Sequence, residues 1–309
     1  MINILKNNNK YSNMEWAKSL NNAALKLNTL EINQILEKTI YLNSNQSKEI
    51  IDSIITTNGK LFSGKGIDLG SGTGLFSSSI SKISNVEKIY SLEIIENYVK
   101  LLQPKIIKKF GISKKVIPTL GTFDDLSYFK DEYFDFIFQY DAFHHAYDLP
   151  KVLNECHRVL KKNGKIISID RIQSDRISND MINRKLEIPY TKEYFYKHCK
   201  DPIKNYTRRD NGEHEIRRNE WYSYFRNSQF MNIKITNYIN YNFKSFIKLI
   251  LSYLPDFILK RTKFRYLVGE SFVSYIGGFM KKNKPTNQGK FINSKLQLHK
   301  DLAVLICNK

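Results

Sequence analysis

Residues 66–76 read GIDLGSGTGLF, an apolar run that passes into three glycines on alternate positions, Gly70, Gly72 and Gly74. Glycine at this density weakens a strand or a helix. A chain keeps it where the backbone takes positive φ angles, or where it must approach a ligand with no Cβ in between. The stretch therefore predicts a strand that ends in a glycine loop, with a ligand held against the backbone N–H groups of that loop.

Apolar strands and amphipathic helices alternate on both sides of this loop. We expect strands at 65–70, 86–94, 114–120, 132–140 and 164–170, and helices at 46–58, 74–83, 95–111 (bent near Pro104) and 149–164 (closed by Gly164). A helix at 217–230, a strand at 230–241 and a last strand within 295–309 follow. This order predicts an α/β fold: a Rossmann-like, doubly wound, seven-stranded sheet, mostly parallel with an antiparallel last strand, and with helices on both faces.

Three segments stand outside this alternation. We interpret residues 1–45 as an N-terminal helical lid on a main domain that spans 46–309. The polar, basic and tyrosine-rich residues 171–217 have no clean period, and we expect them to cap the ligand edge of the sheet. Residues 242–292 form a second insertion, which is basic and aromatic.

The glycine pattern excludes two common nucleotide sites. A dinucleotide fingerprint, G-x-G-x-x-G counted from Gly70, needs a third glycine at position 75, which is Leu75. A P-loop needs a lysine and a serine or threonine after its last glycine, and neither follows here. Glu93 ends the second strand, 23 residues after Gly70, where an acid can accept hydrogen bonds from the ribose hydroxyls of an adenosine-bearing cofactor.

Two further loops complete the pattern. LGTFDDL (120–126) follows the third strand, QYDAFHHAYD (139–148) follows the fourth, and VLNECHRVLKKNGKIISID (152–170) comes next. Together these motifs resemble the class I S-adenosylmethionine-dependent methyltransferases, with a type 11-like methyltransferase domain in the quinone-biosynthesis and small-molecule group. The resemblance covers 65–170 well and 214–240 more loosely.

The resemblance implies S-adenosyl-L-methionine as cofactor, held by the loops after the first four strands. The implied binding residues are Asp68, Gly70, Ser71, Gly72, Thr73, Gly74, Glu93, Ile94, Thr122, Phe123, Gln139 and Tyr140. The family usually has Asp or Asn after the glycine of the third loop, where this chain has Thr122. The adenine contact therefore falls to Thr122 or to Asp124.

Methyl transfer to a hydroxyl also needs a group that removes its proton. Histidine titrates near neutral pH and suits this task, so His144 and His145 after the fourth strand and His214 in NGEHEIRR are the catalytic candidates. In the alternative, the histidine pair caps the next helix or packs under the cap segment. Two adjacent histidines are too few ligands for a metal site, so we predict none.

The net charge of +19 is unevenly distributed. Residues 1–150 hold 17 basic and 16 acidic residues, whereas 151–309 hold 32 and 14. This excess suits a phosphate-bearing substrate or an anionic membrane surface, with a merely solvated basic exterior as the alternative. Residues 241–282 combine ten aromatic residues with eight Lys or Arg, so 242–282 are either a peripheral membrane contact or a flap over the substrate pocket.

We therefore predict a methyltransferase that acts on a small-molecule, sugar or lipid-linked acceptor, on oxygen. An RNA methyltransferase is one alternative, but strand four ends in QYDA and lacks the proline turn that holds an exocyclic base amine, so nucleic acid is disfavoured. A protein that binds the cofactor without turnover is the other. The N-terminus lacks a secretory pattern, no apolar stretch is long enough to span a membrane, and the three cysteines suggest no disulfide framework. These features predict a cytoplasmic protein, with contact to the inner membrane face as a variant, and leave its oligomeric state open.

Overall fold

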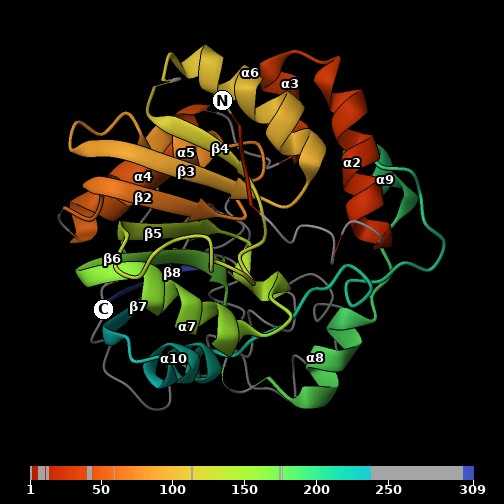
Figure 1. Cartoon of the computed structure of the whole chain (residues 1–309). Helices are drawn as coiled ribbons and strands as arrows, with labels where there is room; N and C mark the ends of the chain where they lie inside the picture. Colours follow the sequence, from red (N-terminus) through yellow and green to blue (C-terminus); the bar gives the residue numbers. More distant parts are fainter. Residues whose placement is uncertain are drawn as a thin grey trace.

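The computed structural model describes residues 2–5, 11, 14–39, 44–58, 60–112, 114–173, 175, 177–237 and 302–309. Its centre is an eight-stranded sheet in the order β1-β4-β3-β2-β5-β6-β8-β7 (Figure 1). The strands are β1 (Asn3–Ile4), β2 (Gly64–Leu69), β3 (Val86–Glu93), β4 (Val116–Leu120), β5 (Phe134–Tyr140), β6 (Leu160–Arg171), β7 (Met231–Asn237) and β8 (Leu302–Asn308). Strand β8 runs antiparallel to β6 and β7, and the other pairs are parallel, which confirms the expected Rossmann-like α/β fold.

Two helical layers cover the sheet. One contains α4 (Ser44–Asn58), α5 (Leu75–Ile80) and α6 (Gln103–Phe110), and the other contains α7 (Leu149–Val159) and α10 (Arg218–Asn227). Neighbouring residues of one strand pack on opposite faces of the sheet. Ile166 of β6 packs in the core on the α7 side, and Ile167 packs in the core on the α4 side. Both faces of the parallel strands are therefore buried, as their apolar sequences require.

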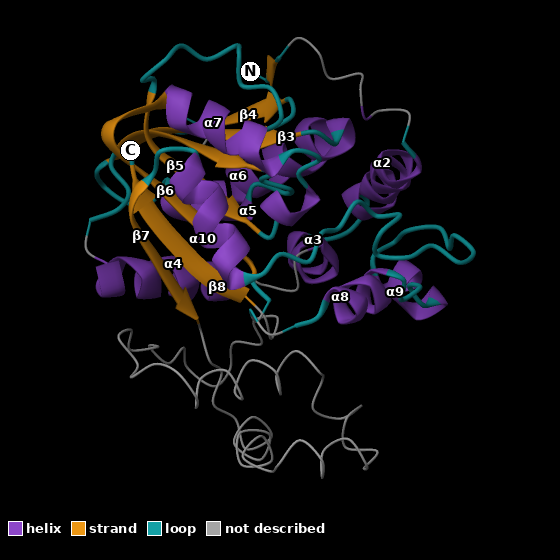
Figure 2. Ribbon diagram, turned by 90° about the horizontal axis from the view of Figure 1, so that it is seen from below, coloured by secondary structure: helices purple, strands orange, loops and turns teal. Residues whose placement is uncertain are grey.

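A third group of helices lies at the edge where the parallel strands end. It consists of α2 (Glu15–Asn28), α3 (Ile32–Thr39), α8 (Asn179–Leu186) and α9 (Lys192–Lys197). Figure 1 shows α2, α8 and α9 on the side to which β2 and β3 point, and Figure 2 shows α3 beside α8 and α9. Helices α2 and α3 share a small core, including Leu27 and Ile35, with the π-helical turn η1 (Tyr98–Leu102). The described parts of the N-terminal lid (1–45) and of the cap segment (171–217) therefore lie over the edge of the sheet where the parallel strands end. We call these two parts the lid segments.

The structure corrects several details of the expected elements. The sheet has eight strands instead of seven, because Asn3–Ile4 pairs with β4 over a stretch too short to show alternation. The helix expected at 149–164 ends at Val159, and β6 begins at Leu160. Leu160 pairs with Phe134 and Lys165 with Phe136, so the residues between them form a bulge within the strand, where Asn163 has a φ of 63°.

Two other segments differ from the expectation. The helix expected at 95–111 consists of the π-helical turn η1 followed by α6, and Pro104 occupies the first turn of α6, where its missing N–H costs nothing. The cap segment 171–217 contains α8 and α9, whose first turns are capped by the Ser178 and Thr191 side chains. The expected insertion at 242–292 and its membrane contact lie outside the described residues. No helix in the described part of the chain is long and apolar enough to cross a membrane.

Candidate active site

The glycine loop between β2 and α5 has the expected backbone. Gly70, Gly72 and Gly74 have φ angles of 69°, 53° and 76°. A Cβ on Gly70 would lie 2.7 Å from the Ala142 side chain, so this position needs glycine for close packing. A Cβ on Gly72 would meet nothing within 4 Å, which means that the backbone of Gly72 borders open space. Both features fit a loop that presents bare backbone to a ligand.

Glu93 holds this loop from the end of β3. Its carboxylate accepts hydrogen bonds from the backbone N–H groups of Gly72 (2.8 Å), Ile94 (2.8 Å) and Ile95 (2.9 Å). Burial raises the pKa of Glu93, although these three hydrogen bonds act in the opposite direction. The predicted ribose-binding acid therefore also fixes the shape of the glycine loop.

Hydrogen bonds among buried polar side chains hold the glycine loop in place. The Ser77 hydroxyl donates to Asp68 at 2.6 Å, and burial raises the pKa of Asp68 to about 7. The Gln103 amide of α6 donates to the Gly72 carbonyl and to the Ser71 hydroxyl, both at 3.0 Å. Gln103 has no sequence signal of its own, because its partners are more than 30 residues away.

A cavity of about 530 Å³ extends from the glycine loop to the lid helices. Its sheet side is lined by Asp68, Gly70, Ser71, Gly72, Thr73, Phe76, Tyr98, Tyr140, Asp141, Arg171 and Gln173. Its lid side is lined by Leu20, Lys38, Thr39, Tyr190, Tyr194, His198, Lys200, Arg208, Glu213 and Glu215. This volume is typical of small-molecule and cofactor sites.

The cavity thus includes six of the predicted cofactor residues, namely Asp68, Gly70, Ser71, Gly72, Thr73 and Tyr140. Gly74, Glu93, Ile94, Thr122, Phe123 and Gln139 are not among the residues that line it. Phe123 lies against the loop, 3.5 Å from where a Cβ on Gly70 would be. The Thr122 hydroxyl donates to Asp124, which also accepts from Tyr11. Both candidates for the adenine contact therefore already have protein partners.

Gln139 points into the interior. Its amide nitrogen lies within hydrogen-bond distance of Ser168 and Asp170, and its amide oxygen accepts from Ala142 N–H at 3.0 Å. We expected a contact with cofactor or substrate, but here Gln139 fixes the loop that follows β5. Strand alternation explains the difference, because Gln139 and Tyr140 point to opposite sides of the sheet and only Tyr140 reaches the cavity.

His144 is buried beneath the same loop. Its Nδ1 lies 2.7 Å from Asp170, and its Nε2 has no hydrogen-bond partner among the described residues. Burial lowers the pKa of His144, but the Asp170 and Asp141 carboxylates together raise it, so that the net shift is upward. His144 is not among the residues that line the cavity.

The other two candidate histidines face solvent. The His145 ring is exposed and lies 4.1 Å from the His144 ring, centre to centre. His214 donates its backbone N–H to the His144 carbonyl, while its side chain is exposed. Its neighbours Glu213 and Glu215 line the cavity instead, as alternation along an extended segment explains.

Asp141, His144 and Asp170 form a group that could hold a metal ion by distance alone. The Asp141 carboxylate is already bound by the Arg171 guanidinium at 2.8 and 3.1 Å. Asp170 accepts from the backbone N–H groups of Phe143 and Arg171 as well as from His144. These oxygens are thus satisfied by protein donors, which argues against a metal here.

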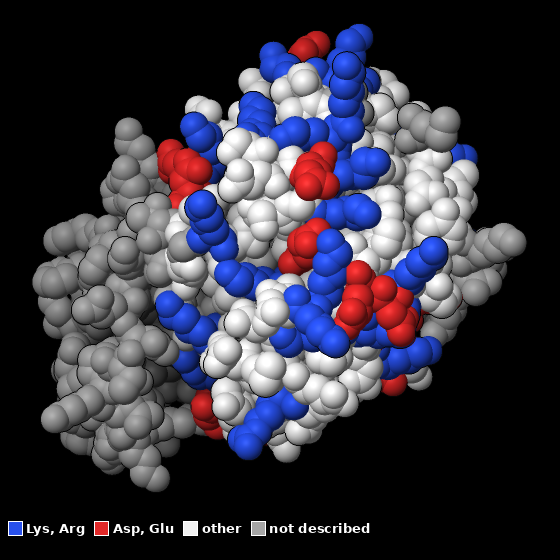
Figure 3. Space-filling view, turned by 60° about the vertical axis from the view of Figure 1, so that its left-hand side comes forward, with Lys and Arg blue, Asp and Glu red and all other residues white. Residues whose placement is uncertain are grey.

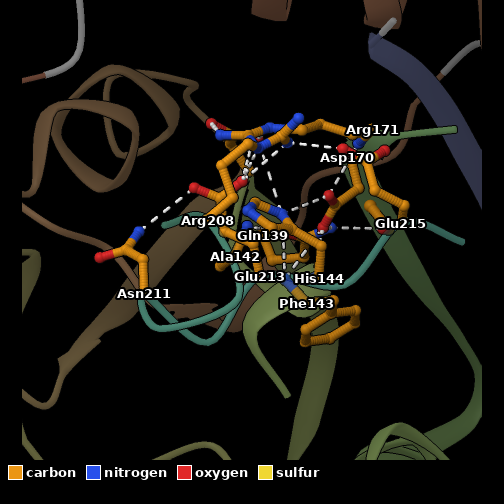
Figure 4. Close-up of polar contacts among 12 residues, drawn as sticks. Gln139, Ala142, Phe143, His144, Asp170, Arg171, Arg208, Asn211, Glu213 and Glu215 are labelled. Carbon is orange, nitrogen blue, oxygen red and sulfur yellow. Dashed lines mark hydrogen bonds and ion pairs between the residues drawn. The ribbon is translucent and has the colours of Figure 1, made fainter. Parts of the chain in front are cut away.

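A charged network crosses the cavity wall between β6 and the cap segment (Figure 4). Arg171 binds Glu213 at 2.6 Å, and Arg208 binds Glu213 at 2.7 Å and Glu215 at 2.6 Å. The second oxygen of Glu213 accepts from Tyr190 and from Asn211. Burial alone would raise the pKa of Glu213, but the two guanidinium groups hold it well below its usual range.

No spacing motif in the sequence predicts this network, because its partners come from segments far apart in the chain. Its only local sign is the alternation of acids and bases in RRDNGEHEIRR (208–218), in which we selected His214 rather than the flanking acids. The network gives the cavity a wall of paired charges between β6 and the cap segment. Such a wall can orient an acceptor molecule through a few fixed polar groups.

Comparison with known proteins agrees with this geometry. The family described as "Methyltransferase domain" matches residues 67–168. The glycine/sarcosine/dimethylglycine N-methyltransferase of Actinopolyspora halophila is 30% identical over 110 residues, which are 35% of this chain and 19% of that protein. An uncharacterized protein of Methanocaldococcus jannaschii is 36% identical over 134 residues, 43% of this chain and 55% of that protein. The chain thus spans about a fifth and about half of the length of these relatives.

Solved structures share the fold. A putative sarcosine dimethylglycine methyltransferase from Galdieria sulphuraria superposes with a TM-score of 0.51 at 20% identity, over 85% of this chain and 84% of that one. The matched residues include the glycine loop and Tyr140, which line the cavity, and also Glu93 and the loop after β4, which lie outside its lining. Residues 67–168 therefore match a methyltransferase domain, a class whose methyl donor is S-adenosylmethionine, and the likeness to the solved structure shows a shared fold.

Proposed function

We propose that this protein transfers the methyl group of S-adenosylmethionine to a small-molecule, sugar or lipid-linked acceptor. The observation that carries the proposal is the cavity itself, which joins the bare backbone of Gly70–Thr73 to a polar, tyrosine-lined recess under the lid segments. A cofactor at the loop and an acceptor in the recess would face each other in one enclosed space. Alignment of this kind contributes up to ~7–11 kcal/mol to a displacement reaction.

The residues of the loop fit the donor. Gly72 leaves room beside its backbone, and the Glu93 carboxylate, with three hydrogen bonds, retains a lone pair for a ribose hydroxyl. The Asp68 carboxyl reaches the cavity, where it can pair with the donor's ammonium group. When bound, S-adenosylmethionine supplies an electrophilic methyl on a sulfonium. For the adenine end we retain Thr122, Phe123 and Asp124 as the proposed contacts.

An oxygen acceptor loses a proton during transfer, and a neutral histidine can take it. We retain the exposed His145 and His214 as candidate bases, since an exposed imidazole is mostly neutral at pH 7, although neither is among the residues that line the cavity. The buried His144 would contribute only by holding the loop after β5, which carries His145, in place through its contact with Asp170. A nitrogen acceptor is the second candidate, because the Actinopolyspora relative is named as an N-methyltransferase of small amino acids.

Two other functions compete with this proposal, namely methylation of RNA and cofactor binding without turnover. In Figure 3, Lys and Arg side chains are spread over one face of the protein and Asp and Glu side chains lie among them. This mixture of signs on that face favours a small acceptor over a long nucleic-acid track. A cofactor-binding protein without turnover would show donor binding but no transfer to any acceptor.

The first test measures donor binding by calorimetry for the natural protein, Gly72→Val and Gly111→Val. Both glycines have positive φ, 53° and 71°, and open space around a Cβ, but Gly111 ends α6 outside the cavity. We expect Gly72→Val to abolish binding and Gly111→Val to keep it, since backbone strain is similar in both. Equal affinities in the two variants would contradict the assignment of the loop.

The second test follows label from methyl-labelled S-adenosylmethionine into pools of amino acids, sugar nucleotides, lipids and RNA. We expect label in a small-molecule or lipid pool and none in RNA. Label in RNA would establish the rival nucleic-acid activity. Donor binding without label in any pool would favour the non-catalytic alternative.

A further inference from the structure

Two lysines at the lid end of the cavity differ from its other basic residues. Arg171 and Arg208 are both engaged by carboxylates. Lys38 at the end of α3 and Lys200 after α9 also line the cavity. Within the described part of the chain, neither ammonium group makes a hydrogen bond or an ion pair. Each lid segment therefore brings to the cavity one lysine that no described carboxylate contacts.

The surroundings of Lys200 strengthen this charge. Its ammonium lies 5.4 Å from the ring of Tyr194, which stacks on Tyr190 at 4.2 Å. Burial lowers the pKa of Lys200 to about 8, and the nearby Glu213 only partly opposes this effect. A half-buried ammonium that contacts no carboxylate directly is costly for the free protein. A ligand anion beside Lys200 would pair with the ammonium and offset this desolvation cost.

His198 joins the two lysines. Its Nδ1 donates to the Lys38 carbonyl at 2.5 Å, which holds α3 against the cap. Burial, together with the positive charges of Lys200, Lys197 and Lys38, lowers its pKa to about 4 in spite of that hydrogen bond. His198 is thus neutral at pH 7 and adds no further positive charge. The neutral ring keeps the two lid segments together beside the unpaired lysines.

We propose that Lys38 and Lys200 form an oxyanion seat that holds a carboxylate or phosphate group of the acceptor at the lid end of the cavity. This inference rests on the proposed methyl transfer for its biological meaning, but the seat can be tested by binding alone. Lysine is a compact, mobile point charge that suits either oxyanion, whereas a planar guanidinium prefers bidentate geometry. Because one lysine comes from each lid segment, an oxyanion between them would also draw the two segments together.

The test uses calorimetric titration of the full chain, saturated with S-adenosylhomocysteine, with inorganic phosphate and separately with acetate. We expect saturable binding of at least one anion. Lys200→Met and Lys38→Met should each weaken it about tenfold, the loss of one charge-assisted hydrogen bond. Lys200→Arg should retain most of the affinity, because it keeps the charge. Lys192→Met removes an exposed lysine from helix α9, which precedes Lys200, and serves as the matched control.

The outcomes separate the seat from the methyl transfer. Binding of phosphate alone indicates a phosphate-bearing acceptor, and binding of acetate alone indicates a carboxylic acid. The proposal is overturned if neither anion binds, or if both lysine variants bind as the Lys192 control does while their unfolding midpoints are unchanged. Gly72→Val should lose donor binding yet retain the anion in the absence of S-adenosylhomocysteine. Methyl transfer in a protein that binds neither anion would overturn the oxyanion seat and leave the proposed methyltransferase function standing.

Discussion

Glu93 and Glu213 are both buried carboxylates at the ligand edge of the sheet, only 7% and 4% exposed, yet their pKa values move in opposite directions. Glu93 is bound by three backbone N–H groups, and burial prevails. Glu213 lies between the guanidinium groups of Arg171 and Arg208, and their charge prevails. Backbone dipoles offset the cost of burying a charge less completely than full cations do.

The difference has a functional meaning. The donors on Glu93 come from the glycine loop and from its own strand end, so the carboxylate shapes a binding loop and can still accept a hydroxyl. Glu213 also receives Tyr190 and Asn211, which leaves little capacity for a ligand. We therefore assign Glu93 to cofactor binding and Glu213 to the architecture of the cavity wall.

The largest effect is expected for Glu213→Ala. Removal of this carboxylate leaves Arg171 and Arg208 short of a counterion in a buried place, which typically costs ~3–5 kcal/mol. The free energy of unfolding, measured with denaturant, should fall by about this amount. Glu187→Ala is the control, since Glu187 pairs with Arg209 on the surface and should contribute about 0–1 kcal/mol. Similar losses in both variants would show that the network is not the stabilising element we describe.

Glu93→Ala should act on ligand affinity. Loss of a charge-assisted hydrogen bond to the ribose is expected to weaken S-adenosylmethionine binding by ~1–3 kcal/mol. Calorimetric titration measures this, with a thermal melt to confirm that the variant is folded. Glu87→Ala, an exposed acid on the same strand, should bind as the natural protein does. Unchanged affinity in Glu93→Ala would mean that another residue holds the ribose.

Asp68→Asn sharpens the comparison, because Asp68 is a buried carboxylate that pairs with no cation among the described residues. Burial raises its pKa from the ordinary 3.8 to about 7. Below pH 4 the carboxyl is protonated in both the folded and the unfolded protein, so there is no penalty. Between pH 4 and 7 only the unfolded state loses its proton, and the stability of the natural protein falls as pH rises.

Above pH 7 the full penalty is present, so Asp68→Asn should stabilise the cofactor-free protein by roughly 1–2 kcal/mol at pH 8. It should leave the stability at pH 4 nearly unchanged and weaken binding of the donor's ammonium group. Denaturant unfolding at the two pH values measures the first effect, and calorimetry measures the second. A variant that is less stable at pH 8 would show that the charge is better compensated than burial suggests.

Local patterns predicted the region around Glu93. The spacing of Gly70, Gly72 and Gly74, the apolar strands that follow them and the acid at the end of β3 are all read within a few residues of each other. For this reason the parallel core and the loop geometry agree with the sequence. The bulge at Leu160–Lys165 was missed because LKKNG has the composition of a helix end, and only pairing with β5 places it in a strand.

The region around Glu213 depends on distant partners. Arg171 and Glu213 are 42 residues apart, and no periodicity links them. The sequence made His214 the catalytic candidate of this segment. In the structure, the extended backbone directs Glu213 and Glu215, on either side of it, to the cavity. The contact of Gln139 with Asp170 on the neighbouring strand β6 is likewise between residues 31 positions apart, and no local pattern predicts it. Tertiary packing decided these contacts.

The smallest expected effect is for Tyr190→Phe, which removes one of several donors to Glu213 and keeps the ring stacked on Tyr194. We expect the free energy of unfolding to fall by about 1 kcal/mol, the usual worth of one hydrogen bond. Tyr196→Phe, which changes an exposed tyrosine near α9's end, should cost nothing measurable. A loss for Tyr190→Phe as large as that of Glu213→Ala would mean that the tyrosine, and not the arginines, sets the charge of Glu213. A loss near 1 kcal/mol supports the arginines as the groups that keep Glu213 ionised, and so completes the contrast with Glu93.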